Sequence, residues 1–224
     1  MNGQLRHEIK FVLDEYKYLS VMSWIYSHTT LKRKFNDRVV NSIYFDDEKF
    51  SSAADNLIGI SKRSKYRYRW YESNFNSGIL EKKIKINKLG FKEYLKVELP
   101  FESSEKISYY ELNCHIKKAL HANDIFHERP FFPALDIQYT RSYFENSEGV
   151  RLTLDDKIFF YDTAYYSNIR RSIPIRNYSY ILELKFTEDK FNYVSNMISQ
   201  LSLVPRRNSK YLTGLASFSK AVYI

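Results

Sequence analysis

Alternation between charged and apolar residues is the feature that most constrains what this chain can fold into. Residues 65–71 read KYRYRWY. Successive side chains of a strand point to opposite faces, so one face carries Lys65, Arg67 and Arg69, and the other carries aromatic rings. Aligned positive charges repel one another unless an anion lies on them. The segment therefore predicts a strand with an anion-binding face, whose aromatic face is buried beneath a flanking helix.

The same alternation recurs in LEKKIKI at residues 80–86, VRLTLDD at 150–156 and ILELKF at 181–186. The solvated face of an ordinary sheet explains any one of these segments. Together, however, their charged faces carry many bases and few acids, and such a bias favours phosphate binding, with the acids holding a divalent cation that bridges phosphates. The acids on these faces are Glu81, Asp155 and Glu183, and the similarly charged face of the strand predicted at residues 5–13 adds Glu8.

Composition narrows the class of protein. The 224 residues are 44% hydrophobic and 17% aromatic, which favours a β-rich core. The formal charge of +9 indicates a polyanionic partner, either nucleic acid, an anionic membrane surface or a phosphorylated small molecule. The glycines form no phosphate-binding loop, so side chains must bind any phosphate. The single cysteine excludes an internal disulfide, and the N-terminus resembles no signal peptide, so we expect a cytoplasmic protein.

The hydrophobic pattern predicts an α+β fold without linkers or repeats. A single domain over residues 1–224 is expected, with about eight mostly antiparallel strands forming a barrel with a charged interior and peripheral helices. The first helix is expected to bury Leu19, Met22 and Ile25. Strands are predicted at residues 5–13, 39–45, 62–71, 79–87, 91–99, 134–144, 150–155, 158–161 and 180–186, and helices at 14–28, 108–122 and 189–201.

Several short motifs carry a family resemblance. In order, they are RHEIKF, YFDD, KYRYRWY, LEKKIKI, the pair RSYF and VRLTLD, ILELKF and RRNSKYLTG. In combination, and over nearly the whole chain, they resemble the polyphosphate polymerase (VTC) domain of the triphosphate tunnel metalloenzyme, or CYTH-like, superfamily. The resemblance implies an eight-stranded tunnel β-barrel in which inward bases bind triphosphate or polyphosphate and an inward glutamate binds a divalent metal.

The resemblance also implies roles for individual residues. Glu183 matches the metal-binding glutamate for Mn²⁺ or Mg²⁺, with Glu8 and Glu81 as further candidates. The phosphate-binding set is Lys10, Arg67, Arg69, Lys83, Lys92, Arg141, Arg151, Arg207 and Lys210, and its expected catalytic members are Arg67, Arg69, Lys83 and Lys210.

Two positions depart from the family pattern, and a third departs from strand alternation. Arg6 replaces the first acid of the usual ExExK strand, and Arg207 stands where lysine is common. Strict alternation from Leu135 places Arg141 on the same side as apolar Ile137, so a bulge or a shifted register is expected there.

The first function hypothesis is an ATP-dependent, metal-dependent polyphosphate polymerase that transfers the γ-phosphoryl group of ATP to a polyphosphate chain. Hydrolysis of triphosphate or of a nucleoside triphosphate is the nearest alternative, and a non-catalytic polyphosphate-binding module is another. The missing first-strand acid favours polymerisation. Nucleic acid is not expected, because the bases and aromatic rings of KYRYRWY lie on opposite faces. Translocation of a product would need a separate membrane protein. The metal, product length and oligomeric state stay open.

Overall fold

The computed structural model describes residues 6–28, 30–87, 89–123, 125 and 131–220. Contacts divide the chain into two compact units that are interleaved along the sequence. Unit 1 comprises residues 1–39, 139–158 and 177–208, and unit 2 comprises residues 40–138, 159–176 and 209–224. That the two units form a single domain over residues 1–224 stays a prediction.

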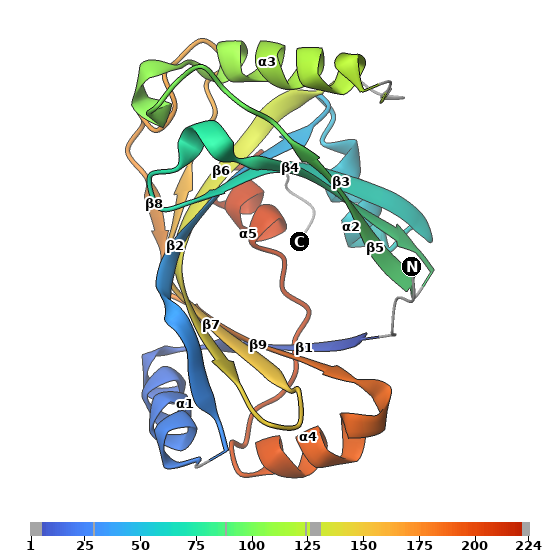
Figure 1. The fold of residues 1–224 in the computed structure, drawn as a ribbon, viewed down its shortest axis with the longest axis vertical. Helices are drawn as coiled ribbons and strands as arrows, with labels where there is room; N and C mark the ends of the chain where they lie inside the picture. Colours follow the sequence, from blue (N-terminus) through green and yellow to red (C-terminus); the bar gives the residue numbers. More distant parts are fainter. Residues whose placement is uncertain (1–5, 29, 88, 124, 126–130, 221–224) are drawn as a thin grey trace. The chain divides into compact units, whose positions relative to one another are not determined.

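Nine strands and five α-helices build the described part of the chain (Figure 1). The strands are β1 (Arg6–Leu13), β2 (Lys32–Asp46), β3 (Lys62–Tyr71), β4 (Ile79–Ile86), β5 (Leu89–Lys96), β6 (Phe132–Glu145), β7 (Arg151–Tyr161), β8 (Ile175–Asn177) and β9 (Tyr180–Thr187). The α-helices are α1 (Glu15–Ser27), α2 (Ser51–Ile58), α3 (Tyr109–Ala122), α4 (Phe191–Ser199) and α5 (Lys210–Ser217). Short 3₁₀ turns span Phe75–Ser77, Ser104–Lys106 and Glu188–Lys190.

The strands are hydrogen-bonded in the order β1-β9-β7-β6-β2-β3-β4-β5, and β8 pairs with β7. Antiparallel pairing joins β1 to β9, β7 to β9, β2 to β3, β3 to β4 and β4 to β5, which confirms the α+β class. The strands β3, β4 and β5 form a meander. Within the described residues this path is open and ends at β1 and β5, so the closed barrel of the sequence prediction is not part of the observed pairing.

The strand count also differs from the predicted eight. Residues 150–155 and 158–161 were expected to form separate strands, but both lie in β7. Lys157 has a φ of 47° and breaks the alternation locally, which a strand accommodates as a bulge. The ninth strand is β8, which has only three residues and therefore too little pattern to be predicted.

The core of unit 1 lies on the apolar face of β1, β7 and β9. There Phe11 of β1, Leu152 of β7 and Leu184 of β9 pack together and are covered by α1 and α4. Asp14 caps α1, accepting a hydrogen bond from the backbone nitrogen of Lys17 at 2.8 Å. Burying this face leaves the charged residues of the same strands on the opposite face.

The predicted apolar stripe of α1 is wrong at one position. Leu19 is 60% exposed, whereas Val21, Trp24 and Ile25 are buried. The large Trp24 side chain fixes which side of the helix faces the core, and Leu19 lies outside that stripe.

The core of unit 2 confirms that the aromatic face of β3 is buried beneath a helix. Tyr68 and Trp70 pack with Phe75 and with Leu112 and Ile116 of α3. The Tyr68 hydroxyl donates a 2.5 Å hydrogen bond to the backbone oxygen of Phe75. The side chains at positions 65, 67 and 69 consequently point to the other face of the sheet.

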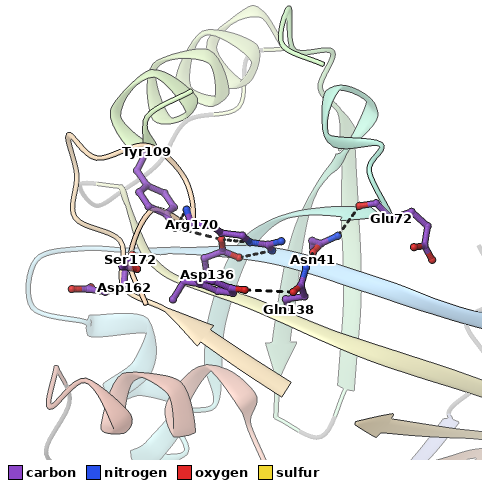
Figure 2. Close-up of polar contacts among 9 residues, drawn as sticks. Asn41, Glu72, Tyr109, Asp136, Gln138, Asp162, Arg170 and Ser172 are labelled. Carbon is purple, nitrogen blue, oxygen red and sulfur yellow. Dashed lines mark hydrogen bonds and ion pairs between the residues drawn. The ribbon is translucent and has the colours of Figure 1, made fainter. Parts of the chain in front are cut away.

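A buried polar network also ties α3 to the sheet in unit 2 (Figure 2). The Asp136 carboxylate accepts from Arg170 Nε at 2.9 Å and from Nη2 at 3.0 Å, and it accepts from the Tyr109 hydroxyl at 3.4 Å. Beside it, the Gln138 amide donates to Asn41 Oδ1 at 3.0 Å. These partners satisfy a carboxylate that lies in the core, so we assign the network a structural role.

In unit 2, helix α5 covers the face of β6 that carries Leu135, opposite the face that carries Asp136. A Cβ atom on Gly214 would lie 2.5 Å from Leu135 Cδ2 and 2.8 Å from Phe160 Cδ1, so only glycine allows this approach. The helix explains why β6 is apolar at Leu135 and Ile137, although Arg141 follows in the same alternation. β6 is one strand from Phe132 to Glu145, and the bulge or register shift expected before Arg141 stays a prediction. No described helix is long and apolar enough to cross a membrane.

Candidate phosphate and metal site

In unit 1, the charged face of β1 and β9 holds a group that we call the Glu183 cluster, formed by Glu8, Lys10, Glu183 and Lys185. The strand register places Lys10 opposite Glu183, and Glu8 opposite Lys185. Glu183 lies 3.6 Å from Lys10 Nζ and 2.5 Å from Lys185 Nζ, and Glu8 lies 2.8 Å from Lys10 Nζ. Two carboxylates and two ammonium groups on adjacent strands therefore form a network of ion pairs.

Glu183 is the buried member of this cluster, with 6% of its surface exposed. Burial alone would raise the pKa of Glu183, but the charges of Lys10, Lys185 and Arg141 and the hydrogen bond from Lys185 hold that pKa well below its usual range. Glu183 is therefore ionised throughout the neutral pH range. Thr153 lies opposite it on β7, and the described residues provide no hydrogen-bond partner for the buried Thr153 hydroxyl.

Arg141 belongs to the charged side of unit 1 and is held by Asp155. Its Nε and Nη2 atoms donate to the two carboxylate oxygens of Asp155 at 2.5 and 2.8 Å. Burial would lower the pKa of Arg141, but the charge of Asp155 raises it well above its usual value. Since Arg141 neutralises Asp155, that carboxylate adds little repulsion toward an anion.

The other two predicted bases of unit 1 are exposed. Arg151 lies opposite Lys185 in the register, and its Nε is 3.3 Å from Glu145 Oε1. Arg207 follows Arg206, whose backbone nitrogen donates to the Lys10 carbonyl oxygen at 2.9 Å. The basic segment near the C-terminus therefore runs beside β1 in unit 1.

In unit 2, Arg67 and Arg69 converge on Glu81, and we call these three residues the Arg67 cluster. Arg67 Nε donates to Glu81 Oε2 at 2.6 Å, its Nη2 also contacts this oxygen, and Arg69 Nη1 lies 3.5 Å from Glu81 Oε1. Burial would raise the pKa of Glu81, but the two arginines lower it. Glu81 thus orients two guanidinium groups. Its ion-pair partners are arginines, whereas those of Glu183 are lysines.

Next to this cluster, three lysines form a row across β3, β4 and β5. Lys65 is opposite Lys83, and Lys83 is opposite Lys92. Burial lowers the pKa of Lys65 to about 8, and the nearby charge of Lys83 acts in the same direction. The candidate set omitted Lys65, although its alternation with Arg67 and Arg69 was the available signal.

Sequence reasoning also missed Tyr44 on β2. Its hydroxyl accepts a hydrogen bond from Arg67 Nη1 at 3.1 Å. Burial would raise the pKa of Tyr44, but the charges of Arg67 and Arg69 and this hydrogen bond lower it to about 8. The tyrosine stands in the YFDD motif, so the motif was recognised without its link to Arg67.

The start of α5 adds polar groups to the charged face of unit 2. Ser209 caps α5 and accepts from Leu212 N at 3.5 Å. Its Oγ also lies 3.5 Å from Lys65 Nζ. The predicted base Lys210 is the first residue of α5. Six of the predicted site residues lie in each unit: Glu8, Lys10, Arg141, Arg151, Glu183 and Arg207 in unit 1, and Arg67, Arg69, Glu81, Lys83, Lys92 and Lys210 in unit 2.

The described residues contain no group of three or more acids, histidines or cysteines arranged to hold a metal ion. The carboxylates of Glu183 and Glu8 do fit a different donor set, in which one or two protein carboxylates and several phosphate oxygens share a Mg²⁺ or Mn²⁺ ion. A cation bound in this way would require phosphate to be present.

Comparison with known proteins supports the sequence resemblance. A family model described as the VTC domain matches residues 5–219. No curated protein matches the chain. Among solved structures, the PH1819 protein from Pyrococcus horikoshii OT3 is similar with a TM-score of 0.52 and 13% identity, over 95% of this chain and 99% of that one. At this identity the likeness concerns the fold alone.

Two further solved structures are more distant. A candidate adenylate cyclase from Vibrio parahaemolyticus aligns with a TM-score of 0.49 and 12% identity, over 95% of this chain and 99% of that chain. The inorganic triphosphatase NE1496 aligns with a TM-score of 0.30 and 10% identity, over 85% of this chain and 81% of that chain.

Proposed function

Because the chain belongs to the VTC domain family, we propose that it is a metal-dependent polyphosphate polymerase, which transfers the γ-phosphoryl group of ATP to the end of a polyphosphate chain and releases ADP. The observation that carries the proposal is the row of Lys65, Lys83 and Lys92 beside Arg67 and Arg69. Such a density of positive charge on one sheet face favours binding of polyanionic phosphate.

These side chains suit phosphoryl transfer, which depends mainly on in-line positioning and on neutralising the phosphoryl oxygens. Arg67 and Arg69 supply planar guanidinium groups that bind two oxygens at once, and the lysines supply point charges along a chain. The attacking atom is a terminal phosphate oxygen that is already anionic near neutral pH. The reaction therefore requires no general base.

Glu183, together with Glu8, would hold the divalent cation. When bound there, a cation supplies charge neutralisation between phosphate oxygens. Lys10 and Lys185 neutralise the two carboxylates, so the cluster does not repel an incoming phosphate chain. The tunnel β-barrel within a single domain, which the family resemblance implies, is part of this proposal.

The test is to incubate the purified chain with ATP and either Mn²⁺ or Mg²⁺. Electrophoresis should detect polyphosphate that lengthens with time, and ADP should appear in equal amount to the phosphate incorporated. Release of free phosphate without polyphosphate would instead assign hydrolysis of triphosphate or nucleoside triphosphate. Binding of polyphosphate without turnover of ATP would assign a non-catalytic binding module.

We further expect triphosphate affinity to fall as the pH rises from about 7 to about 9. Lys65 loses its positive charge, and Tyr44 gains a negative one, as the pH passes their pKa values of about 8. Both changes reduce the attraction for phosphate. Calorimetric titration with inorganic triphosphate should therefore give a steeper loss of affinity for the wild type than for Lys65→Arg, which stays protonated. Equal slopes would exclude Lys65 from the site.

A further inference from the structure

The buried carboxylate of Asp46 accepts four hydrogen bonds. It is 4% exposed, and it accepts hydrogen bonds from the backbone nitrogens of Asp47 and Ser52 at 2.9 Å and of Ala53 at 3.0 Å. A fourth bond comes from the Tyr211 hydroxyl at 2.6 Å. The start of α2 thus fixes the carboxylate, and the carboxylate in turn fixes Tyr211.

Tyr211 passes this constraint to β2. It is 2% exposed, and its ring stacks on the Tyr44 ring with centroids 5.0 Å apart and an interplanar angle of 14°. Lys65 Nζ lies 5.5 Å from the centroid of the Tyr211 ring. Burial and the charge of Asp46 raise the pKa of Tyr211 well above its usual value, so its hydroxyl remains a donor.

Tyr44 completes a chain of contacts that ends at the candidate phosphate site. Its hydroxyl accepts from Arg67 Nη1 at 3.1 Å, and Arg67 is otherwise held by Glu81. All these residues lie within unit 2. Without the phenol, the guanidinium would lose this hydrogen bond and could rotate more freely.

We propose that Asp46, Tyr211 and Tyr44 form a clasp that positions Arg67 for phosphate binding. The proposal rests on the function proposed above and deepens it. The three are positioning residues, since they act through Arg67. A long arginine side chain loses rotamer freedom when it binds phosphate, and a clasp that holds it beforehand removes part of that entropic cost.

The test is calorimetric titration with inorganic triphosphate. Tyr211→Phe keeps the stacked ring and removes only the hydroxyl, and we expect it to weaken binding about tenfold, the effect of one hydrogen bond to a charged group. Tyr109→Phe is the matched control: it also removes a buried tyrosine hydroxyl bonded to a buried carboxylate, but on the opposite face of the sheet (Figure 2). It should leave the affinity unchanged.

A double-mutant cycle separates positioning from general packing. If Tyr211 acts through Arg67, then Tyr211→Phe should cause little further loss of affinity in an Arg67→Ala background. Tyr44→Phe should behave in the same way, and it keeps the test valid if Tyr211→Phe fails to fold. An equal loss in both backgrounds, or unchanged affinity for Tyr211→Phe and Tyr44→Phe in a wild type that binds triphosphate, overturns the clasp. A folded wild type that binds no triphosphate overturns the proposed function itself.

Discussion

Replacing Arg67 or Arg69 by alanine is expected to weaken binding of inorganic triphosphate by about 1.5–3 kcal/mol, which is the range for a hydrogen bond to a charged group. Both guanidinium groups converge on Glu81, on a face that also carries the Lys65, Lys83 and Lys92 row. Each substitution leaves Glu81 one arginine partner, so the protein should remain folded. Isothermal titration calorimetry and thermal melting measure the two effects separately.

Lys82→Ala provides the control for loss of positive charge. Lys82 is on β4 between Glu81 and Lys83, so its side chain projects from the opposite face, where it lies 3.5 Å from Glu93. This variant should bind triphosphate like the wild type. Unchanged affinity in both arginine variants would contradict the phosphate-binding role of the KYRYRWY face, whereas loss of folding would assign the arginines to the structure alone.

The alternating segments were the part of the fold that could be predicted from sequence. The predicted bounds of β3, residues 62–71, are the observed ones, and burial of its aromatic face beneath α3 is confirmed. In these strands the period of two coincides with burial of one face, so the sequence determines which side chains face the core.

Where side chains are exposed on both faces, the pattern disappears. The strand predicted at residues 39–45 is the second half of β2, which begins at Lys32. Residues 32–38 are all exposed, so they show no alternation between apolar and polar residues. Hydrogen bonding to neighbouring strands makes this segment a strand, and such long-range pairing cannot be inferred from local sequence.

The contacts between distant motifs could likewise not be predicted from the sequence. The hydrogen bond from Tyr211 to Asp46 joins residues that are 165 positions apart. Each residue was visible within a family motif, YFDD or RRNSKYLTG, but local periodicity contains no information on which motifs meet. The roles of Glu183 and of the nine predicted phosphate-binding bases stay predictions until binding is measured.

Glu183→Gln is expected to abolish metal-dependent turnover while leaving metal-free binding of triphosphate largely intact. The amide keeps the size of the side chain but removes the charge that would hold a divalent cation. Lys10 and Lys185 would lose their buried partner and both could turn to phosphate, so metal-free affinity should not fall. Calorimetric titration with Mn²⁺ in the presence of triphosphate, and the polyphosphate assay, measure the two effects.

Stability gives a second and independent measure of the same carboxylate. Because the folded-state pKa of Glu183 is held below its unfolded value, its ionised form stabilises the protein above the unfolded pKa, and this contribution is lost as the pH falls. Glu183→Gln should therefore melt at a lower temperature than the wild type near pH 7, with the gap narrowing in acid. Glu8→Gln is the matched control for the melting temperature, because Glu8 belongs to the same cluster but is more exposed. The Glu8 side chain is 33% exposed, and the Glu183 side chain is 8% exposed. Full turnover of Glu183→Gln at ordinary Mn²⁺ concentrations would move the metal site to Glu8 or Glu81, and the melting data would then describe a purely structural ion pair.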